Sequence, residues 1–411
     1  MTEPIQVYEY ENGLTLVTQR MDWVESVAFS LLVPAGCSRD PQSLLGLGNI
    51  TCEMVQRGCG PRDSRQFVND LENLGVDHSA SVSNSHASFG GAMLADKLEA
   101  ALTIHADLVQ CPHLPADQLE DARLTCIQEI RALEDNLAQR ALQALRLRRY
   151  GEPFGRSSQG ALETMSRIGM DDIRAFFATA YRPNGAILSV AGKIDFPRLR
   201  DRVGELFASW RPAPNAELEC VPQNGAPEHI PHESNQTHIA IGYESVPYCH
   251  ADYYQARAAV GVLSDGMSSR LFTEVREKRG LCYAVYAVCH TLRDRGSVFC
   301  YAGTTTERAQ ETLDVMLHEL RQLSCGVHAD ELQRLKARLK SALIMQQESS
   351  SARSGSIAAD WYYLRRIQTL EEVGRIVDGL TCESINRYLA EHLPAEFLIV
   401  TLGQNALELP R

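Results

Sequence analysis

Residues 163–192 read ETMSRIGMDDIRAFFATAYRPNGAILSVAG, and residues 371–403 read EEVGRIVDGLTCESINRYLAEHLPAEFLIVTLG. Each stretch holds an amphipathic helical pattern, then an apolar strand of about five residues, then a glycine. A second pair, LPADQLEDARLTCIQEI at 114–130 and HADELQRLKARLKSALI at 328–344, is separated by a similar offset of about 210 residues. Repetition over such a distance indicates a tandem duplication, so the sequence predicts two copies of one fold.

The segments upstream of these repeats follow one another in the same order. Each half has a strand pattern followed by a helix, and then a strand-rich stretch followed by a second helix. The segments are 24–34, 44–57, 81–94 and 96–110 in the first half, and 237–246, 251–264, 283–304 and 307–324 in the second.

Two homologous domains of the α+β class follow from this order. We expect α/β-sandwich-like domains over residues 1–210 and 235–411, each with helices layered on one face of a sheet. Residues 211–234 are rich in Pro, Asn, Gly and Glu and carry no hydrophobic period, which predicts a linker.

Composition excludes several classes of protein. The formal net charge of −12 argues against nucleic acid as a partner, because phosphate binding needs clustered Lys and Arg. No apolar run approaches the roughly 18–20 residues that cross a bilayer, so no membrane partner is expected. The 12 cysteines are scattered, and the N-terminus carries no targeting pattern, which together favour a cytoplasmic protein.

The stretch LLGLGNITCEMVQRG, residues 44–58, carries the first candidate site. Asn49, Cys52 and Glu53 have the spacing that places side chains on one face of a helix. A zinc peptidase needs two histidines and a carboxylate on such a helix, and this helix contains no histidine. Gly46-Leu-Gly48 lacks the later glycine, lysine and acidic residue of a nucleotide-binding loop, so a phosphate site is set aside.

GLGNITCEMVQRG resembles the G-L-x-H-x-x-E-H-M-x-x-x-G segment of the M16 (pitrilysin-like, inverzincin) metallopeptidases. The resemblance implies that Asn49 and Glu53 replace two zinc-binding histidines and that Cys52 replaces the glutamate base. It also implies that Glu129, 76 residues after Glu53, occupies the position of the third zinc ligand. ENGLTLV at 11–17 and GEPFGRSSQGALETMSRI at 151–168 extend the similarity along nearly the whole chain.

The altered motif leaves two chemical alternatives. Asn49, Cys52, Glu53 and Glu129 would form a thiolate and carboxylate set able to hold zinc, but the shorter Asn and the differently shaped Glu fit the histidine positions poorly. We therefore expect no metal in this chain. Cys52 as a nucleophile needs an adjacent base, and none is evident. The remaining histidines in question are expected to be packed or solvated: His78, His86, His229 and His232.

SSRLFTEVREKRGLCYAVYA, residues 268–287, resembles the family segment that points an Arg and a Tyr toward the zinc. The matching residues are Arg276 and Tyr283. An Arg donates hydrogen bonds to a peptide backbone or carboxylate, and a Tyr hydroxyl donates to an oxyanion. The structural alternative is that Arg276 is one of several surface charges and that the Tyr283 ring is packed.

The family includes heterodimers in which one chain carries the zinc motif and a homologue lacks it, and the two close like a clamshell around a peptide. The resemblance therefore implies half of a clamshell: a non-catalytic subunit with no activity alone, supplying Arg276 and Tyr283 in trans. The expected partners are a homologous subunit that has His-x-x-Glu-His and binds the zinc, and an unstructured peptide. The alternatives are a structural scaffold, like respiratory core subunits, and a homodimeric peptide-binding protein.

Overall fold

The computed structural model describes residues 5–214, 218 and 225–409. The chain divides into two compact units, each of which takes segments from both halves of the sequence. Each unit combines one main sheet with helices, so the predicted α+β class is confirmed. The first unit consists of Met1–Ala132, Glu152–Val221 and Met345–Gln368, and the second of Leu133–Gly151, Pro222–Ile344 and Thr369–Arg411.

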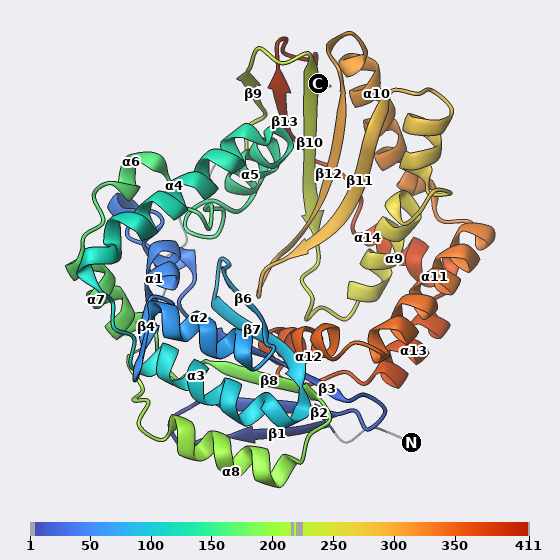
Figure 1. Cartoon of the computed structure of the whole chain (residues 1–411). Coiled ribbons are helices and arrows are strands. Elements are labelled where there is room, and N and C mark those ends of the chain that lie inside the picture. The colour runs from blue at the N-terminus through green and yellow to red at the C-terminus, as the bar shows by residue number, and fades with distance from the viewer. Residues whose placement is uncertain (1–4, 215–217, 219–224, 410–411) are drawn as a thin grey trace. The chain divides into compact units, whose positions relative to one another are not determined.

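The first unit is built on a six-stranded sheet with the order β1-β2-β8-β3-β7-β6 (Figure 1). β2 and β8 are parallel, and the other neighbours are antiparallel. The strands are β1 Ile5–Glu9, β2 Thr15–Arg20, β3 Ser26–Val33, β6 Asp77–Val82, β7 Ala87–Leu94 and β8 Ile187–Gly192, with a separate ribbon of β4 Gly58–Cys59 and β5 Arg62–Asp63.

Helices cover both faces of this sheet. Phe29, Leu31 and Val33 of β3 point into the main core, which includes side chains of α1, α3 and α7. Leu32, between them, packs in a smaller cluster with Ile357 of α12, as expected for the alternation of side chains along a strand. The helices are α1 Leu47–Val55, α2 Ser64–Asn73, α3 Leu98–Gln110, α4 Leu119–Asp135, α6 Leu162–Met165, α7 Met170–Ala180, α8 Phe196–Phe207 and α12 Ser350–Leu364.

The second unit repeats this plan with a five-stranded sheet of order β11-β12-β10-β13-β9. Ile239 and Ile241 of β10 lie in its core, whereas Gly242 faces Leu145 of α5. The strands are β9 Glu228–Pro231, β10 Gln236–Ser245, β11 Cys282–Thr291, β12 Gly296–Thr305 and β13 Leu398–Gly403. The helices are α5 Leu137–Tyr150, α9 Tyr253–Ser264, a π-helix at Phe272–Glu277, α10 Ala309–Gln322, α11 Ala329–Gln347, α13 Leu370–Gly379 and α14 Cys382–Glu391.

Two equivalent helices of the duplication are exchanged between the units. α5 follows α4 in the first half of the chain but contacts β10, β12 and β13, whereas α12 follows α11 in the second half but contacts β2, β3 and β8. The colours of Figure 1 show the exchange, because the orange α12 lies with blue and green strands. Polar bonds fix α12: the Ser189 hydroxyl donates to the Ser354 carbonyl at 2.8 Å, and Arg353 Nε donates to Gln19 Oε1 at 2.8 Å.

Several local expectations change in the structure. Helices were expected on one face of the sheet of the first unit, but they cover both faces, because α12 packs on the second face. Residues 81–94 belong to two strands, since the chain turns between β6 and β7. Part of the predicted linker forms β9, which pairs in parallel with β13, while residues 215–217 and 219–224 lie outside the described residues. Across the described residues, no helix is both long and apolar enough to cross a bilayer.

Candidate functional site

The start of α1 is fixed by a buried carboxylate. Asp40 accepts hydrogen bonds from the backbone N–H groups of Gly46 and Gly48, both at 2.8 Å. Gly46 has a φ of 97°, a left-handed conformation that favours glycine, and a Cβ there would lie 2.8 Å from Met165 Cε. Burial raises the pKa of Asp40 to about 7, while these backbone donors and nearby Arg156 oppose the rise. The two N–H groups considered for phosphate therefore already bind a carboxyl group of the chain.

Asn49 and Glu129 are brought together by the approach of α1 and α4. The Asn49 Nδ2 group donates to Glu129 Oε2 at 2.9 Å, across 80 residues of sequence. The fold thus places Glu129 beside Asn49. The Asn49 amide therefore acts as a hydrogen-bond donor to the Glu129 carboxylate.

Glu53 is bound by a neighbour on its own helix. Its Oε1 forms an ion pair of 2.8 Å with Arg57 Nη2, one helical turn later. Both side chains are partly buried, so the pair is shielded from solvent more than an ordinary surface pair. A metal ion at this position would have to compete with the guanidinium for the carboxylate.

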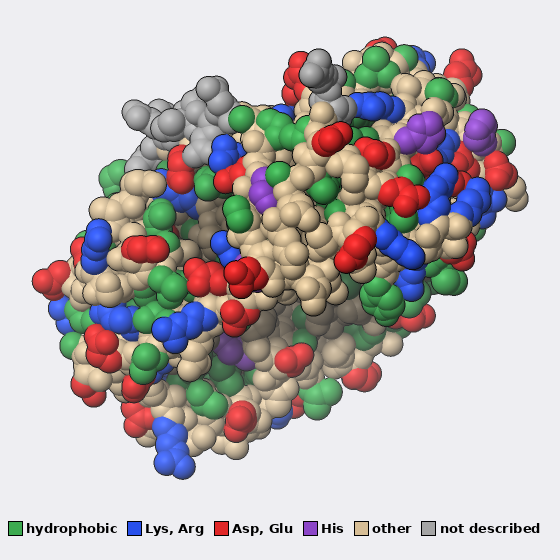
Figure 2. Space-filling view, turned by 90° about the horizontal axis from the view of Figure 1, so that it is seen from above, with side chains coloured by type: hydrophobic (Ala, Val, Ile, Leu, Met, Phe, Trp, Pro, Cys, Tyr) green, Lys and Arg blue, Asp and Glu red, His purple; other side chains and the backbone are tan. Residues whose placement is uncertain are grey.

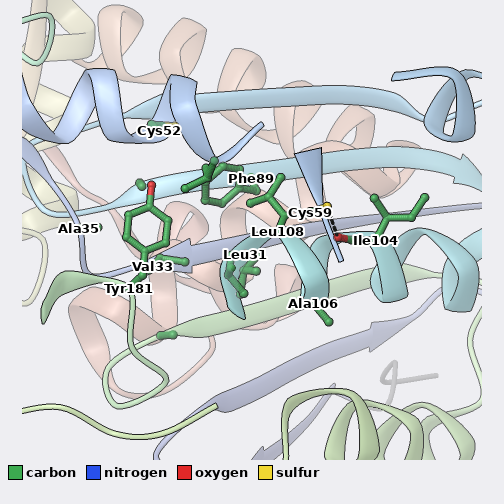
Figure 3. Close-up of a cluster of buried hydrophobic side chains, with 14 of the residues drawn as sticks. Leu31, Val33, Ala35, Cys52, Cys59, Phe89, Ile104, Ala106, Leu108 and Tyr181 are labelled. Atoms are coloured by element: carbon green, nitrogen blue, oxygen red, sulfur yellow. Dashed lines mark hydrogen bonds between the residues drawn. The ribbon is translucent and has the colours of Figure 1, made fainter. Parts of the chain in front are cut away.

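Cys52 points into the core, where it is 4% exposed. Figure 3 shows it among buried apolar side chains, with the Tyr181 hydroxyl directed toward its helix. Burial raises the pKa of the Cys52 thiol, and Glu53 and Cys126 add to this rise. Tyr181 neighbours the thiol, yet its hydroxyl finds no partner of normal hydrogen-bond geometry among the described residues. The thiol is therefore held protonated, which is unfavourable for a nucleophile.

These positions do not fit a zinc ion. Among the described residues, no group of three or more His, Cys, Asp or Glu side chains is arranged to hold a metal. Asn49 offers its amide N–H to Glu129, Glu53 is paired with Arg57, and Cys52 faces the core. The polar side chains of Asn49 and Glu53 thus already have partners within the chain.

The histidines singled out in the sequence are engaged elsewhere. His229 Nδ1 lies 2.9 Å from Thr401 Oγ1, and the buried His86 ring contacts Tyr362. His78 Nε2 lies 3.1 Å from Gln56 Oε1, and His78 Nδ1 lies 3.3 Å from His105 Nε2. The ring of His232 is partly buried, and its Nδ1 lacks a partner among the described residues.

Arg276 and Tyr283 come together on two irregular backbone segments. Arg276 lies in the π-helix at Phe272–Glu277, and Tyr283 lies at a β-bulge between Cys282 and Ala284 of β11. Both irregularities are frequent near functional sites because they redirect side chains. The Arg276 guanidinium carbon is 4.8 Å from the ring centroid of Phe272 and 4.8 Å from that of Tyr283.

The Tyr283 side chain is 84% exposed, so its ring is not packed in the core. Arg276 also differs from its charged neighbours, because Lys278 and Arg279 both pair with Glu274. Within the described part of the chain, Arg276 forms no ion pair of that kind. A guanidinium held between two rings and an exposed phenol are available to an external ligand that accepts hydrogen bonds.

Sequence reasoning missed three residues of these sites. Phe272, four residues before Arg276, lies at a spacing that places helical side chains together, so this signal was present. Asp40 and Tyr181 reach α1 from distant parts of the chain, and no spacing relates them to it.

On the face of the molecule in Figure 2, acidic and basic side chains are interspersed.

Two family models match the chain in succession. Residues 15–159 match the model described as "Insulinase (Peptidase family M16)" and residues 167–339 the model described as "Peptidase M16 inactive domain". Among curated relatives, a Rickettsia felis protein named "Uncharacterized zinc protease" is 25% identical over 387 residues, 94% of each chain. A similarly named Bacillus subtilis protein, YmxG, is 24% identical, with 93% of this chain and 94% of the relative covered.

Solved structures share the same fold. A "peptidase M16 inactive domain" from Pseudomonas fluorescens superposes with a TM-score of 0.89 at 25% identity, covering 99% of this chain and 100% of the other. "A protease from Helicobacter pylori" gives a TM-score of 0.88 at 20% identity, covering 97% and 99% of the two chains. At that identity, the second similarity concerns the fold alone.

Proposed function

Because this chain belongs to the M16 peptidase family, we propose that it is the non-catalytic subunit of a heterodimeric zinc peptidase. Its partner is a homologous subunit with an intact His-x-x-Glu-His motif, which binds the zinc and activates water. Zinc belongs to that partner, and this chain contributes Arg276 and Tyr283. The proposal places the complex in the cytoplasm, in keeping with the 11 free cysteines among the described residues.

The observation that carries the proposal is the contrast between the two sites. At the altered motif, Asn49 bonds to Glu129, Glu53 pairs with Arg57, and Cys52 is buried. Arg276, in contrast, is partly exposed and Tyr283 is exposed, and both lie on irregular backbone segments where a ligand can reach them. Loss of the metal site together with retention of a hydrogen-bonding pair supports a role in binding peptide for chemistry performed by another subunit.

The chemistry assigned to the pair follows from its donors. Arg276 would donate to a peptide carbonyl or carboxylate, and stacking between Phe272 and Tyr283 limits the side-chain entropy lost on binding. The Tyr283 hydroxyl would donate to the oxyanion of the tetrahedral intermediate. β11 is an outer strand of its sheet, which supports a peptide lying along it as an added strand.

Reconstitution with the partner tests the proposal. The wild-type chain and a homologue carrying His-x-x-Glu-His are co-expressed, and cleavage of an unstructured peptide is measured. Arg276→Ala and Tyr283→Phe should each lower kcat by roughly 100-fold if they assist the transition state. The matched controls are Arg279→Ala, which removes a nearby arginine paired with Glu274, and Tyr286→Phe on the same strand; both should stay near wild type.

The outcomes separate the proposal from its alternatives. If the mixture is active and both variants are as fast as wild type, Arg276 and Tyr283 play no part in catalysis. If no catalytic homologue binds the chain, and the isolated chain dimerises and binds peptide without cleavage, it is a peptide-binding homodimer. Stable assembly without peptide binding or cleavage would identify a scaffold.

A further inference from the structure

A series of four polar contacts, each at hydrogen-bond distance, runs through the first unit from α1 across β6 to α3. Gln56 Nε2 donates to the Cys52 carbonyl at 2.9 Å, and Gln56 Oε1 lies 3.1 Å from His78 Nε2. His78 Nδ1 lies 3.3 Å from His105 Nε2, and His105 Nδ1 lies 2.8 Å from the Ala101 carbonyl oxygen. Both ends of the series are carbonyl oxygens, which only accept hydrogen bonds.

The protons along this series of contacts can be counted. Gln56 Oε1 accepts, so His78 must carry its proton on Nε2, and the Ala101 carbonyl accepts, so His105 must carry its proton on Nδ1. A neutral imidazole carries only one proton. Two lone pairs therefore face each other between His78 Nδ1 and His105 Nε2, and the central contact lacks a proton.

The surroundings keep both rings neutral near pH 7. His105 is 0% exposed, and its ring contacts Phe29, while the His78 ring contacts Phe67. Burial lowers the pKa of His105 to about 3 and also lowers the pKa of His78.

Opposing groups face the pair from the neighbouring elements. The Ala101 carbonyl of α3 accepts a hydrogen bond from His105, and the Gly90 backbone of β7 is a second hydrogen-bond acceptor for His78; both raise the pKa of the ring they contact. Asp77, on the same strand as His78, adds a negative charge that also favours protonation. The uncharged Gln56 amide faces the pair from α1.

We propose that His78 and His105 form a buried proton-binding site, which takes up one proton between His78 Nδ1 and His105 Nε2 as the pH falls. The proton comes from solvent, one N–H···N bond forms, and the pair gains one positive charge. The facing lone pairs are replaced by a bond that links β6 to α3.

This site makes the attachment of β6 depend on pH. β6 is an outer strand of the six-stranded sheet, and His78 ties it on one side to Gln56 at the end of α1. With the shared proton, His78 is also hydrogen-bonded to α3, while the buried charge lowers the stability of the fold, because the pKa of each ring lies below that of a free histidine. Protonation of the His78–His105 pair thus affects contacts among three elements: α1, β6 and α3.

Nitrogen NMR of the full-length chain, labelled with ¹⁵N-histidine, tests the site. At pH 7.5, His78 should appear as the Nε2–H tautomer and His105 as the Nδ1–H tautomer. On acidification, the two rings should shift together with one midpoint and one proton for the pair, while circular dichroism reports that the fold persists. If His78 is already the Nδ1–H tautomer at pH 7.5, the contact between His78 and His105 already holds a proton, and the proposal is wrong. Separate titration of the two rings would also overturn the proposal.

The Gln56→Met variant should lose the joint proton uptake that is expected of the wild type. Methionine has a similar length but leaves His78 Nε2 without its acceptor, so His78 can move its proton to Nδ1 and donate to His105. The concerted uptake should then disappear. If it persists unchanged in the folded variant, Gln56 does not set the tautomer, and the proton count above is wrong. Should the variant fail to fold, the wild-type tautomers decide alone.

Discussion

Asp40 offers a sharp test of how burial and helix capping compete in this fold. The carboxyl group accepts two N–H donors at the start of α1, which favour its charged form, while burial favours the neutral form. Burial is the larger effect, and it raises the pKa of Asp40 from 3.8 to about 7. The folded chain therefore holds this proton more tightly than the unfolded chain.

The sign and size of the pH dependence follow from linkage. A raised pKa gives a stability contribution that is complete below pH 3.8 and is lost as the pH rises through about 7. At about 1.4 kcal/mol for each pKa unit, the loss amounts to about 4 kcal/mol. Asp40→Asn keeps the shape and one acceptor oxygen but does not titrate. The free energy of unfolding of wild type relative to Asp40→Asn should therefore fall by about 4 kcal/mol between pH 4 and pH 8.

Tryptophan fluorescence during urea unfolding is a suitable assay. The chain has 3 tryptophans, Trp23, Trp210 and Trp361, and all belong to the first unit, which contains Asp40. Asp171→Asn serves as the control for the removal of a carboxylate, because the Asp171 side chain is fully exposed. A constant difference between wild type and Asp40→Asn would refute the dominance of burial. A wild type that gains stability with rising pH would show that the N–H donors prevail.

Three further predictions concern the altered motif and the exchanged helix. At pH 8, a thiol reagent should modify the exposed Cys111, Cys249 and Cys325 of the folded chain but not Cys52, as mapped by mass spectrometry; rapid modification of Cys52 would contradict its burial. The isolated wild-type chain should retain less than about 0.1 zinc per chain after dialysis, whereas the N49H/C52E/E53H variant, with Glu129 as third ligand, should retain about one, measured by metal analysis. Leu145→Ala should destabilise the packing of α5 on β10 by about 2–5 kcal/mol, which hydrogen exchange in Gln236–Ser245 would report as a faster rate. Substitution of the exposed Leu124 by alanine is the control. Unchanged exchange would mean that α5 does not protect this strand.

Hydrophobic periodicity was sufficient to locate the main elements. The strand expected at 24–34 is Ser26–Val33, and the helix expected at 44–57 is Leu47–Val55. The helix begins later because Gly46 adopts a left-handed conformation that ends the preceding turn. The strand β9 was missed, since a short parallel outer strand with Pro231 at its end carries no alternating pattern.

The identities of the site residues were readable, but their roles depended on contacts. That Asn49, Cys52 and Glu53 share a helix followed from spacing, and so did the absence of histidine. Spacing could not show that Cys52 turns into the core, because a helix face is solvated or buried according to what packs against it. Tyr283 shows the reverse case: it is exposed and lies at a β-bulge that no sequence pattern marks.

By itself, the sequence determined the repeated order of elements, the α+β class and the absence of histidine from residues 44–58. These depend on residue identity and on local periodicity, which act over a few residues. Only the tertiary structure decided that α5 and α12 are exchanged, that Asn49 meets Glu129, and that His78 and His105 share one contact. The reason is physical: such contacts join residues far apart in the chain, and the packing of whole elements places them, so no local pattern encodes the distance between two side chains.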